Sequence, residues 1–509
     1  MSAPFTDIPA DIAADDVARL HQIGYPQQLV RRMGPLAAFS IPFSVISLLT
    51  GPVTLFSFAL VTGGPAALVW TWVGLGPPVL CVAFALAEIC SAYPTSGALY
   101  FWAYQLAGRR KVFASWVTAW LNALGQVAGT AAAAYSAALF LGAFLATGWG
   151  ITITPGRVLG LFATILLVCA VVNSLSVRLV AFLNEFSTLV HVGGALVISF
   201  ALLALPTHHQ SAGFVFGHFV NDTGFRSTAY VWLLAPLTIM FTMTGLDAPG
   251  HMAEETEQAA RTAPRAIVRS VAWSWILGLL VILALLFAIQ HYTTEADSAG
   301  TYAVAPAAII SDAIGGALGK LLVGWIILAQ ILCVNACITT MPRMFFAVGR
   351  DSVFPGSPYL HSVAGRRRVP MWALWASAAL AFLFGLPAYW STTLFLAVTS
   401  IAATGMFLSY AIPIALRLRA GRRFTPGPYR LRAPRLVGAL AVGYVAIAAV
   451  LVCLPTTRPI TISTFNYTPI VLVVTLLGVG CYFAYGTRHY RGPRRFTEQE
   501  IAVIEDGTV

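Results

Sequence analysis

Long apolar runs separated by short polar segments make up most of this 509-residue chain. Most of the runs hold about 20 residues, the length that an α-helix needs to cross the hydrocarbon core of a bilayer. A polar leader precedes the first run, and a polar, basic tail follows the last one. The pattern therefore predicts an all-α integral membrane protein with about 12 transmembrane helices.

Two of the apolar runs are interrupted by glycine and proline. The run Ser40–Leu60 has Thr50-Gly51-Pro52 at its middle, and the run Trp232–Glu255 contains Thr244-Gly245 and then Pro249-Gly250. Proline removes a backbone donor, and glycine loosens the helix. Lipid cannot satisfy the free peptide groups of a broken helix. We therefore expect both breaks to be buried in protein or to face a wet cavity.

Paired breaks in corresponding parts of two halves point to the substrate site of a secondary transporter. The second half of a broken helix presents N–H groups that suit a carboxylate, and the first half presents carbonyls that suit an ammonium group or a cation. A zwitterionic amino acid matches both. Pro52 has no N–H, so the first break offers one donor fewer. Ordinary proline kinks are the alternative explanation.

The basic residues follow the membrane pattern and not a nucleic-acid pattern. The chain is 58% hydrophobic and 10% charged, with a net charge of +11. All but four of its 30 Lys and Arg residues fall in alternate polar segments; the exceptions are Arg157, Arg226, Lys320 and Arg458. By the positive-inside rule, this predicts a multi-pass protein with an even number of spans and both termini in the cytoplasm. The basic, Ala- and Arg-rich composition and the short polar leader indicate the plasma membrane.

Motifs for cofactor or metal chemistry are missing from the sequence. The seven cysteines form no CxxC pair, and no HExxH or GxSxG motif occurs. The stretch Gly315–Lys320 resembles a phosphate-binding loop, but Leu321 follows where Ser or Thr is needed. We expect no enzyme activity, no cofactor, no bound metal and no nucleic-acid partner.

Six short motifs are shared with a known family. They are GYPQQLVRRM (24–33), SLLTGPVTLF (47–56), AEICSAYPTSGALYFWA (87–103), GLDAPGHMAEE (245–255), AVGRDSVFP (347–355) and SYAIPI (409–414). With them the chain resembles the amino acid–polyamine–organocation superfamily, in particular the amino acid/choline transporter branch that includes GABA permeases. The resemblance extends from Gly24 to about Tyr485.

The resemblance implies a LeuT-like fold, a five-plus-five inverted repeat in which helices 1 and 6 are discontinuous. Its site lies between helices 1, 3, 6, 8 and 10. The expected segments are a cytoplasmic leader (1–35), a first repeat (36–206), an extracytoplasmic loop (207–227), a second repeat (228–417), helices 11 and 12 (418–485) and a cytoplasmic tail (486–509).

The resemblance also assigns a substrate-binding role to residues of both breaks. The substrate carboxylate of relatives meets the turn of the first helix, where this chain has Thr50 and Gly51. The amino group meets carbonyls that flank the breaks. The expected binding residues are Ser47, Thr50, Gly51, Phe241, Thr244 and Gly245. In relatives an aromatic residue at the position of Phe241 covers the substrate, although Phe241 could equally be a core residue.

Several polar residues of other spans are further candidates for the pocket wall. Gln126, Asn335 and also Asn122 could line the pocket or tie helices together. The resemblance places Asp247 in the break of the sixth helix, and if it faces the pocket, a polyamine or a basic amino acid becomes a plausible substrate. Opposed charges near the cytoplasmic side, such as Glu255 and Arg343, could form an inner gate or a solvated rim.

His191 lies within the apolar fifth run, where an ionisable side chain is costly and indicates function. Some relatives carry a lysine here, at the place of a sodium ion in sodium-coupled transporters. Imidazole changes its charge near physiological pH. We expect His191 to couple transport to protons; a hydrogen-bonded structural histidine is the alternative.

These observations predict a proton-coupled symporter for an amino acid or a related small zwitterion, such as GABA or a neutral amino acid. An amino acid exchanger or a choline or polyamine permease are alternatives within the transporter class. A channel or a nutrient receptor on the same fold is an alternative from another class.

Overall fold

The computed structural model describes residues 10–29, 31, 33–175, 177–297, 304–362, 369–461, 464–486 and 490–505. In these ranges the chain is helical, and the β-structure is limited to two isolated bridges, Met33 with Thr256 and Thr62 with Asn221. The all-α prediction is therefore confirmed.

Eleven segments of the described chain are long and apolar enough to cross a membrane. The first of them runs through α2 (Pro35–Ile46) and α3 (Gly51–Thr54). The other ten coincide largely with α5 (Gly64–Ala92), α7 (Lys111–Trp149), α8 (Pro155–Leu175), α9 (Val177–Ala204), α14 (Ala259–Phe287), α17 (Gly316–Arg350), α19 (Met371–Gly385), α20 (Thr392–Ala420), α21 (Pro434–Leu451) and α22 (Thr468–Gly486). The expected sixth span is divided into α11 (Thr228–Leu234), α12 (Leu237–Thr242) and α13 (Ala248–His251).

Shorter helices connect these spans or lie at their ends. They are α1 (Ala10–Gln22), α4 (Phe56–Val61), α6 (Ala98–Leu106), α10 (Ala212–Gly217), α15 (Tyr292–Asp297), α16 (Ala305–Ala313), α18 (Ser357–Leu360) and α23 (Glu498–Glu505), with 3₁₀ turns at Gly108–Arg110, Ala253–Glu255, Leu386–Tyr389 and Gly421–Arg423.

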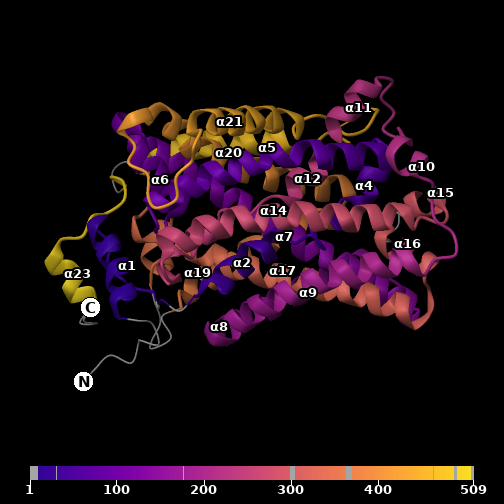
Figure 1. The fold of residues 1–509 in the computed structure, drawn as a ribbon, viewed down its shortest axis with the longest axis horizontal. Helices are drawn as coiled ribbons and strands as arrows, with labels where there is room; N and C mark the ends of the chain where they lie inside the picture. Colours follow the sequence, from indigo (N-terminus) through magenta and orange to yellow (C-terminus); the bar gives the residue numbers. More distant parts are fainter. Residues whose placement is uncertain are drawn as a thin grey trace.

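The long helices run side by side along the long axis of the molecule (Figure 1). The first and the last described helices, α1 and α23, lie together at one end of this bundle, while α10, α15 and α16 lie at the other end. An even number of crossings brings the two termini to the same side. The arrangement agrees with eleven apolar spans and one divided span.

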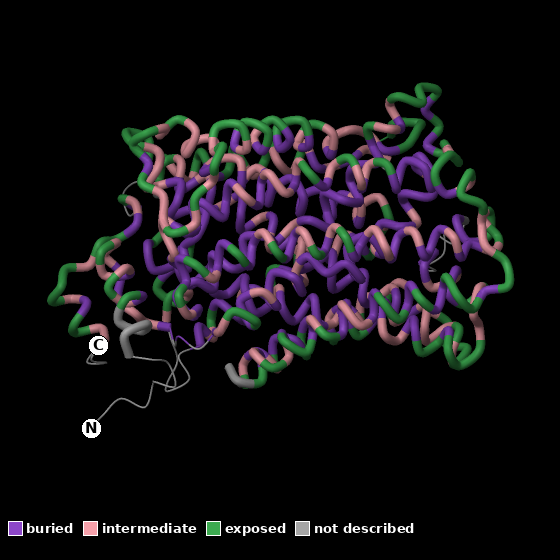
Figure 2. The backbone as a smooth tube through the Cα atoms, viewed as in Figure 1, coloured by how far each residue is buried: buried purple, intermediate pink, exposed green. Residues whose placement is uncertain are grey.

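Burial decreases from the interrupted spans outward, as Figure 2 shows. The most apolar part of Pro35–Thr54 is 83% buried, whereas that of Thr468–Tyr485 is only 11% buried. The exposed positions of α21 and α22 are large and apolar, for example Leu436, Ile447, Val474 and Leu477. Side chains of this kind suit lipid contact. The last two helices therefore pack on the outside of a core that the interrupted spans share with α7, α17 and α20.

Candidate functional site

The first break lies between α2 and α3. Ser47 ends α2 in the left-handed conformation, with φ of +41°. Its carbonyl accepts hydrogen bonds from the N–H groups of Thr50 and Gly51, both at 2.9 Å. The sequence predicted free N–H groups at this turn, and for these two residues that expectation is wrong, because the turn at Ser47 brings its own carbonyl back onto them.

The second break follows Thr242, where α12 ends. Gly245 has φ of +80°, a conformation that glycine adopts without the steric cost of a Cβ. Its N–H donates to the hydroxyl of Tyr410 on α20, at 3.0 Å. The Thr244 hydroxyl donates to the Phe241 carbonyl, at 2.8 Å. The peptide groups of this break are thus held partly by side chains.

The two breaks touch each other at their glycines. A Cβ on Gly51 would lie 2.4 Å from Oγ1 of Thr242, at the end of α12. A Cβ on Gly245 would lie 2.2 Å from Cγ1 of Val45, near the end of α2. Real Cβ atoms do not approach neighbours this closely. Glycine at both positions therefore allows the interrupted spans to meet.

A small cavity of about 50 Å³ lies where the breaks meet. A volume of this size has room for on the order of four water molecules. Its polar wall comes from the two breaks, α7 and α17. The residues that line it include Val45, Ile46, Thr50, Gly51, Gly125, Gln126, Thr130, Phe241, Thr244, Gly245, Asp247, Ala248, His251, Cys333, Cys337, Thr340 and Met406.

Most of the binding residues expected from the sequence lie in this wall. The cavity is lined by Thr50, Gly51, Gln126, Phe241, Thr244, Gly245 and Asp247. Ser47, His191 and Asn335 are not among its lining residues. Asn335 accepts a hydrogen bond from Asn173 of α8, at 2.9 Å, and so ties two helices together. The expectation that Asn335 lines the pocket is therefore corrected: its side chain ties two helices together.

His191 lies behind the first break and is fully buried. Its Nδ1 lies 2.7 Å from the Ser187 carbonyl, and its Nε2 lies 2.7 Å from the Ser47 hydroxyl. The Ser47 hydroxyl is in turn 2.6 Å from the Thr50 hydroxyl. A chain of two hydroxyl groups therefore connects the imidazole to a residue of the cavity wall.

Asp247 takes part in a buried polar network. One carboxylate oxygen accepts a hydrogen bond from the Tyr410 hydroxyl at 2.8 Å. The other accepts one from the Asn122 side chain at 2.8 Å and lies 3.0 Å from Nε2 of His251. His251 and Tyr410 were missed in the sequence. The i, i+4 spacing of Asp247 and His251 is the signal that could have revealed the first of them.

Two buried ion pairs join α17 to the 3₁₀ turn Ala253–Glu255. Arg343 of α17 contacts Glu255 at 2.9 Å, and Arg350 contacts Glu254 at 3.4 Å. All four side chains are less than a tenth exposed, so they do not form a solvated rim. The leader adds to this region, because Asp16 accepts a hydrogen bond from the N–H of Gln258 at 2.7 Å.

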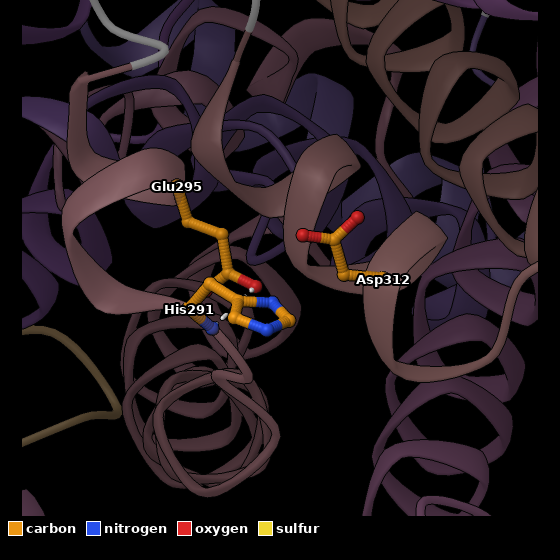
Figure 3. Close-up of side chains that lie close together, drawn as sticks. All are labelled: His291, Glu295 and Asp312. Atoms are coloured by element: carbon orange, nitrogen blue, oxygen red, sulfur yellow. Dashed lines mark hydrogen bonds between the residues drawn. The ribbon is translucent and has the colours of Figure 1, made fainter.

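A separate cluster lies at α15 and α16, at the end of the bundle opposite to α1 and α23. Figure 3 shows His291, Glu295 and Asp312 close together, with ligand-type atoms all within 4.8 Å of one another. His291 and Asp312 are exposed, whereas Glu295 is buried and accepts hydrogen bonds from the N–H groups of Gln290 and His291. Burial, together with the neighbouring Asp312, raises the pKa of Glu295. The cluster thus combines a buried carboxyl group with an exposed carboxylate.

Comparison with known proteins identifies the family. Residues 34–476 match the family described as Amino acid permease. The amino-acid permease BAT1 of Arabidopsis thaliana is 36% identical over 93% of this chain and 95% of its own length. Its homolog in Oryza sativa is also 36% identical, over 96% of this chain and 98% of its own length. The GABA-specific permease of Saccharomyces cerevisiae is 29% identical over 96% of this chain and 87% of its own length. With two interrupted spans that meet at a small polar cavity, this chain belongs to the amino acid permease family.

Proposed function

We propose that this protein is a secondary active transporter that moves an amino acid or a related small zwitterion across the plasma membrane. The observation that carries the proposal is the contact between the two breaks at Gly51 and Gly245, beside a cavity lined by both breaks. Transport would follow alternating access, in which the broken helices hold the substrate while one bundle rocks against the other. Residues 36–206 and 228–417 would form the two repeats.

The polar groups of the breaks support binding of a zwitterion. The substrate carboxylate would meet the Thr50 hydroxyl and the N–H groups of Thr50 and Gly51, replacing their bonds to the Ser47 carbonyl. The ammonium group would meet the carbonyls of Ser47, Phe241 and Thr244. A carbonyl oxygen has two lone pairs, so the Phe241 carbonyl can accept a second hydrogen bond in addition to that of Thr244.

Phe241 would cover the bound substrate. Its side chain lines the cavity and is only 5% exposed. An aromatic ring at this place would shield the polar contacts from water and pack against the aliphatic part of the substrate.

The cavity favours zwitterions over dications. Asp247 is the carboxylate of the cavity wall, and its two oxygens already accept hydrogen bonds from Tyr410 and Asn122 and lie near His251. A second ammonium group of a polyamine or a basic amino acid would have to displace these partners. GABA and neutral amino acids need no such exchange.

Proton coupling is proposed through His191. Nδ1 faces a backbone carbonyl and must donate, so protonation of the ring would take place at Nε2, toward Ser47. A protonated Nε2 donates to the Ser47 hydroxyl, which then donates to Thr50. A neutral ring accepts from Ser47 and reverses this chain. The charge of His191 would thereby change what the Thr50 hydroxyl offers to the substrate.

The test is uptake by purified protein in proteoliposomes, with a panel of neutral amino acids, GABA, choline, basic amino acids and polyamines. Saturable uptake and counterflow support a transporter, and ohmic current without saturation supports a channel. Collapse of the proton gradient should end net accumulation; accumulation that persists contradicts proton coupling.

His191→Ala tests the coupling step. It should abolish uphill uptake while leaving counterflow exchange, because exchange needs no net proton movement. Uphill uptake equal to that of the unmodified protein would contradict this role.

A further inference from the structure

The hydrogen-bond partners of His251 determine where its protons lie. Nδ1 is 3.1 Å from the carbonyl of Ser96, which can only accept, so Nδ1 carries a hydrogen. Nε2 is 3.0 Å from a carboxylate oxygen of Asp247. A bare nitrogen lone pair facing an ionised carboxylate would be repulsive. One further proton must therefore lie between Nε2 and Asp247.

The neighbouring amides fix the direction of this network. The side-chain nitrogen of Asn122 donates to Asp247, so the side-chain oxygen of Asn122 faces Gln126. Gln126 therefore points its amide nitrogen both at Asn122, at 2.9 Å, and at Nε2 of His251, at 3.1 Å. The amide of Gln126 thus contacts the same ring nitrogen that shares the proton with Asp247.

The hydrogen-bond partners of the pair are uncharged: amides of α7, the Ser96 carbonyl and the Tyr410 hydroxyl of α20. The elements packed against α13 are α2, which contributes no titratable side chain, α6, α14, α17 and the turn Ala253–Glu255. Tyr100 of α6 donates to Asp351 instead. The other titratable groups on these elements, and on α7 and α20, are Cys333 and Cys337 across the cavity, Arg343 and Arg350, which pair with Glu255 and Glu254, and also Tyr104, Lys111, Tyr135, Arg261, Arg265, Arg269, Lys320, Arg417 and Arg419.

We propose that Asp247 and His251 hold one shared proton in the cavity wall, and that this proton cancels the carboxylate charge and so sets the preference for zwitterions over cations. The inference rests on the proposed transport of amino acids. Both residues line the cavity and are 1% exposed. With the proton in place, the wall carries no net charge, and the substrate ammonium group is left to the carbonyls of the breaks. Without it, the wall is anionic and attracts a cation.

The first test compares His251→Gln with the unmodified protein. Glutamine brings its own amide hydrogens to Asp247, so the carboxylate no longer needs a shared proton. We expect the affinity for a dication such as putrescine, relative to a neutral amino acid, to rise roughly tenfold, the effect of one charge contact. Asp247→Asn should show no such rise. An unchanged affinity ratio in His251→Gln would overturn the inference while leaving amino acid transport intact.

A second measurement needs no substrate. The thermal unfolding midpoint of the purified protein is recorded from about pH 5 to pH 8, the range in which a histidine exposed by unfolding changes its charge. His251→Gln, Asp247→Asn and the double variant should all lose the same part of the pH dependence of the unfolding midpoint. His208→Gln, at an exposed position, should retain the full pH dependence. If each variant retains the full profile of the unmodified protein, the shared proton does not exist.

If no amino acid binds to the unmodified protein, the proposed function fails. The unfolding profile then still decides whether the pair holds a proton.

Discussion

Gly245→Ala tests whether the two interrupted spans meet as described. Gly245 has φ of +80°, and a Cβ there would lie 2.2 Å from Cγ1 of Val45. The left-handed conformation costs alanine about 1–2 kcal/mol. Overpacking of a filled interior adds about 1–3 kcal/mol. Valine is stiff at χ1 and cannot easily turn its methyl group away. We therefore expect Gly245→Ala to lower the stability by about 2–5 kcal/mol.

Val45→Ala separates the two contributions. It removes Cγ1 and leaves the Cβ of Val45, which would be 3.3 Å from the new methyl group. In the Gly245→Ala/Val45→Ala double variant most of the overpacking should disappear while the backbone cost remains. A double-mutant cycle should therefore show a favourable coupling of about 1–3 kcal/mol, because the cycle removes the separate cost of losing the valine methyl groups.

Gly356→Ala is the matched control. Gly356 has φ of +74°, and nothing lies within 4 Å of a Cβ built on it. Its replacement should cost only the backbone part, about 1–2 kcal/mol. Stability is measured by thermal unfolding in detergent, and uptake is recorded in parallel. If Gly245→Ala costs no more than Gly356→Ala, or if Val45→Ala gives no rescue, the breaks do not meet at this point.

Three further predictions concern other parts of the molecule. Cys333 and Cys337 both line the cavity, so a small thiol reagent should block uptake, and the transported amino acid should protect against it. The Cys333→Ala/Cys337→Ala double variant should remove the sensitivity, whereas Cys481→Ala at an exposed position should leave inhibition unchanged. Arg343→Met should lower the stability measured by thermal unfolding by about 3–5 kcal/mol, because it leaves Glu255 buried and unpaired. Adding Glu255→Gln should recover most of the lost stability. An Arg343→Met variant as stable as the unmodified protein would contradict the pairing. The pKa of Glu295 is raised, so its protonated form stabilises the fold below the ordinary glutamate pKa of about 4.3, and this stabilisation is lost as the pH rises through the raised pKa of the folded state. Glu295→Gln should therefore flatten the pH profile of the unfolding midpoint above a pH of about 4. An unchanged slope would refute the shift.

The sequence was sufficient to predict the interrupted spans, because Gly and Pro in an apolar run carry a direct physical consequence at membrane depth. It was not sufficient to predict which face of an apolar helix looks into the cavity. Successive residues of a helix are about 100° apart, so Asn335 lies about 200° from Cys333, whereas Cys337 lies on nearly the same face as Cys333. On α17, which is apolar on most sides, polarity drew attention to Asn335, and the cysteines that line the cavity were missed.

The hydrogen bonds at the first break were hidden from the sequence for a different reason. Free N–H groups follow from an ideal helix end, but Ser47 adopts φ of +41° and turns its carbonyl onto Thr50 and Gly51. Nothing in the residue types requires a serine to adopt this conformation. His251 shows the opposite case, since its i, i+4 spacing from Asp247 was visible but lay across an expected break.

The polar groups of both breaks already bond to one another, and this determines how a substrate can bind. The N–H groups of Thr50 and Gly51 bond to Ser47, and the Phe241 carbonyl bonds to Thr244. A substrate carboxylate would therefore replace internal bonds, and an exchange of one hydrogen bond for another contributes only about 1 kcal/mol. We infer that these polar groups select the charges of the substrate and their spacing. Most of the affinity would then come from burial of the aliphatic part of the substrate against apolar cavity residues such as Phe241 and Met406.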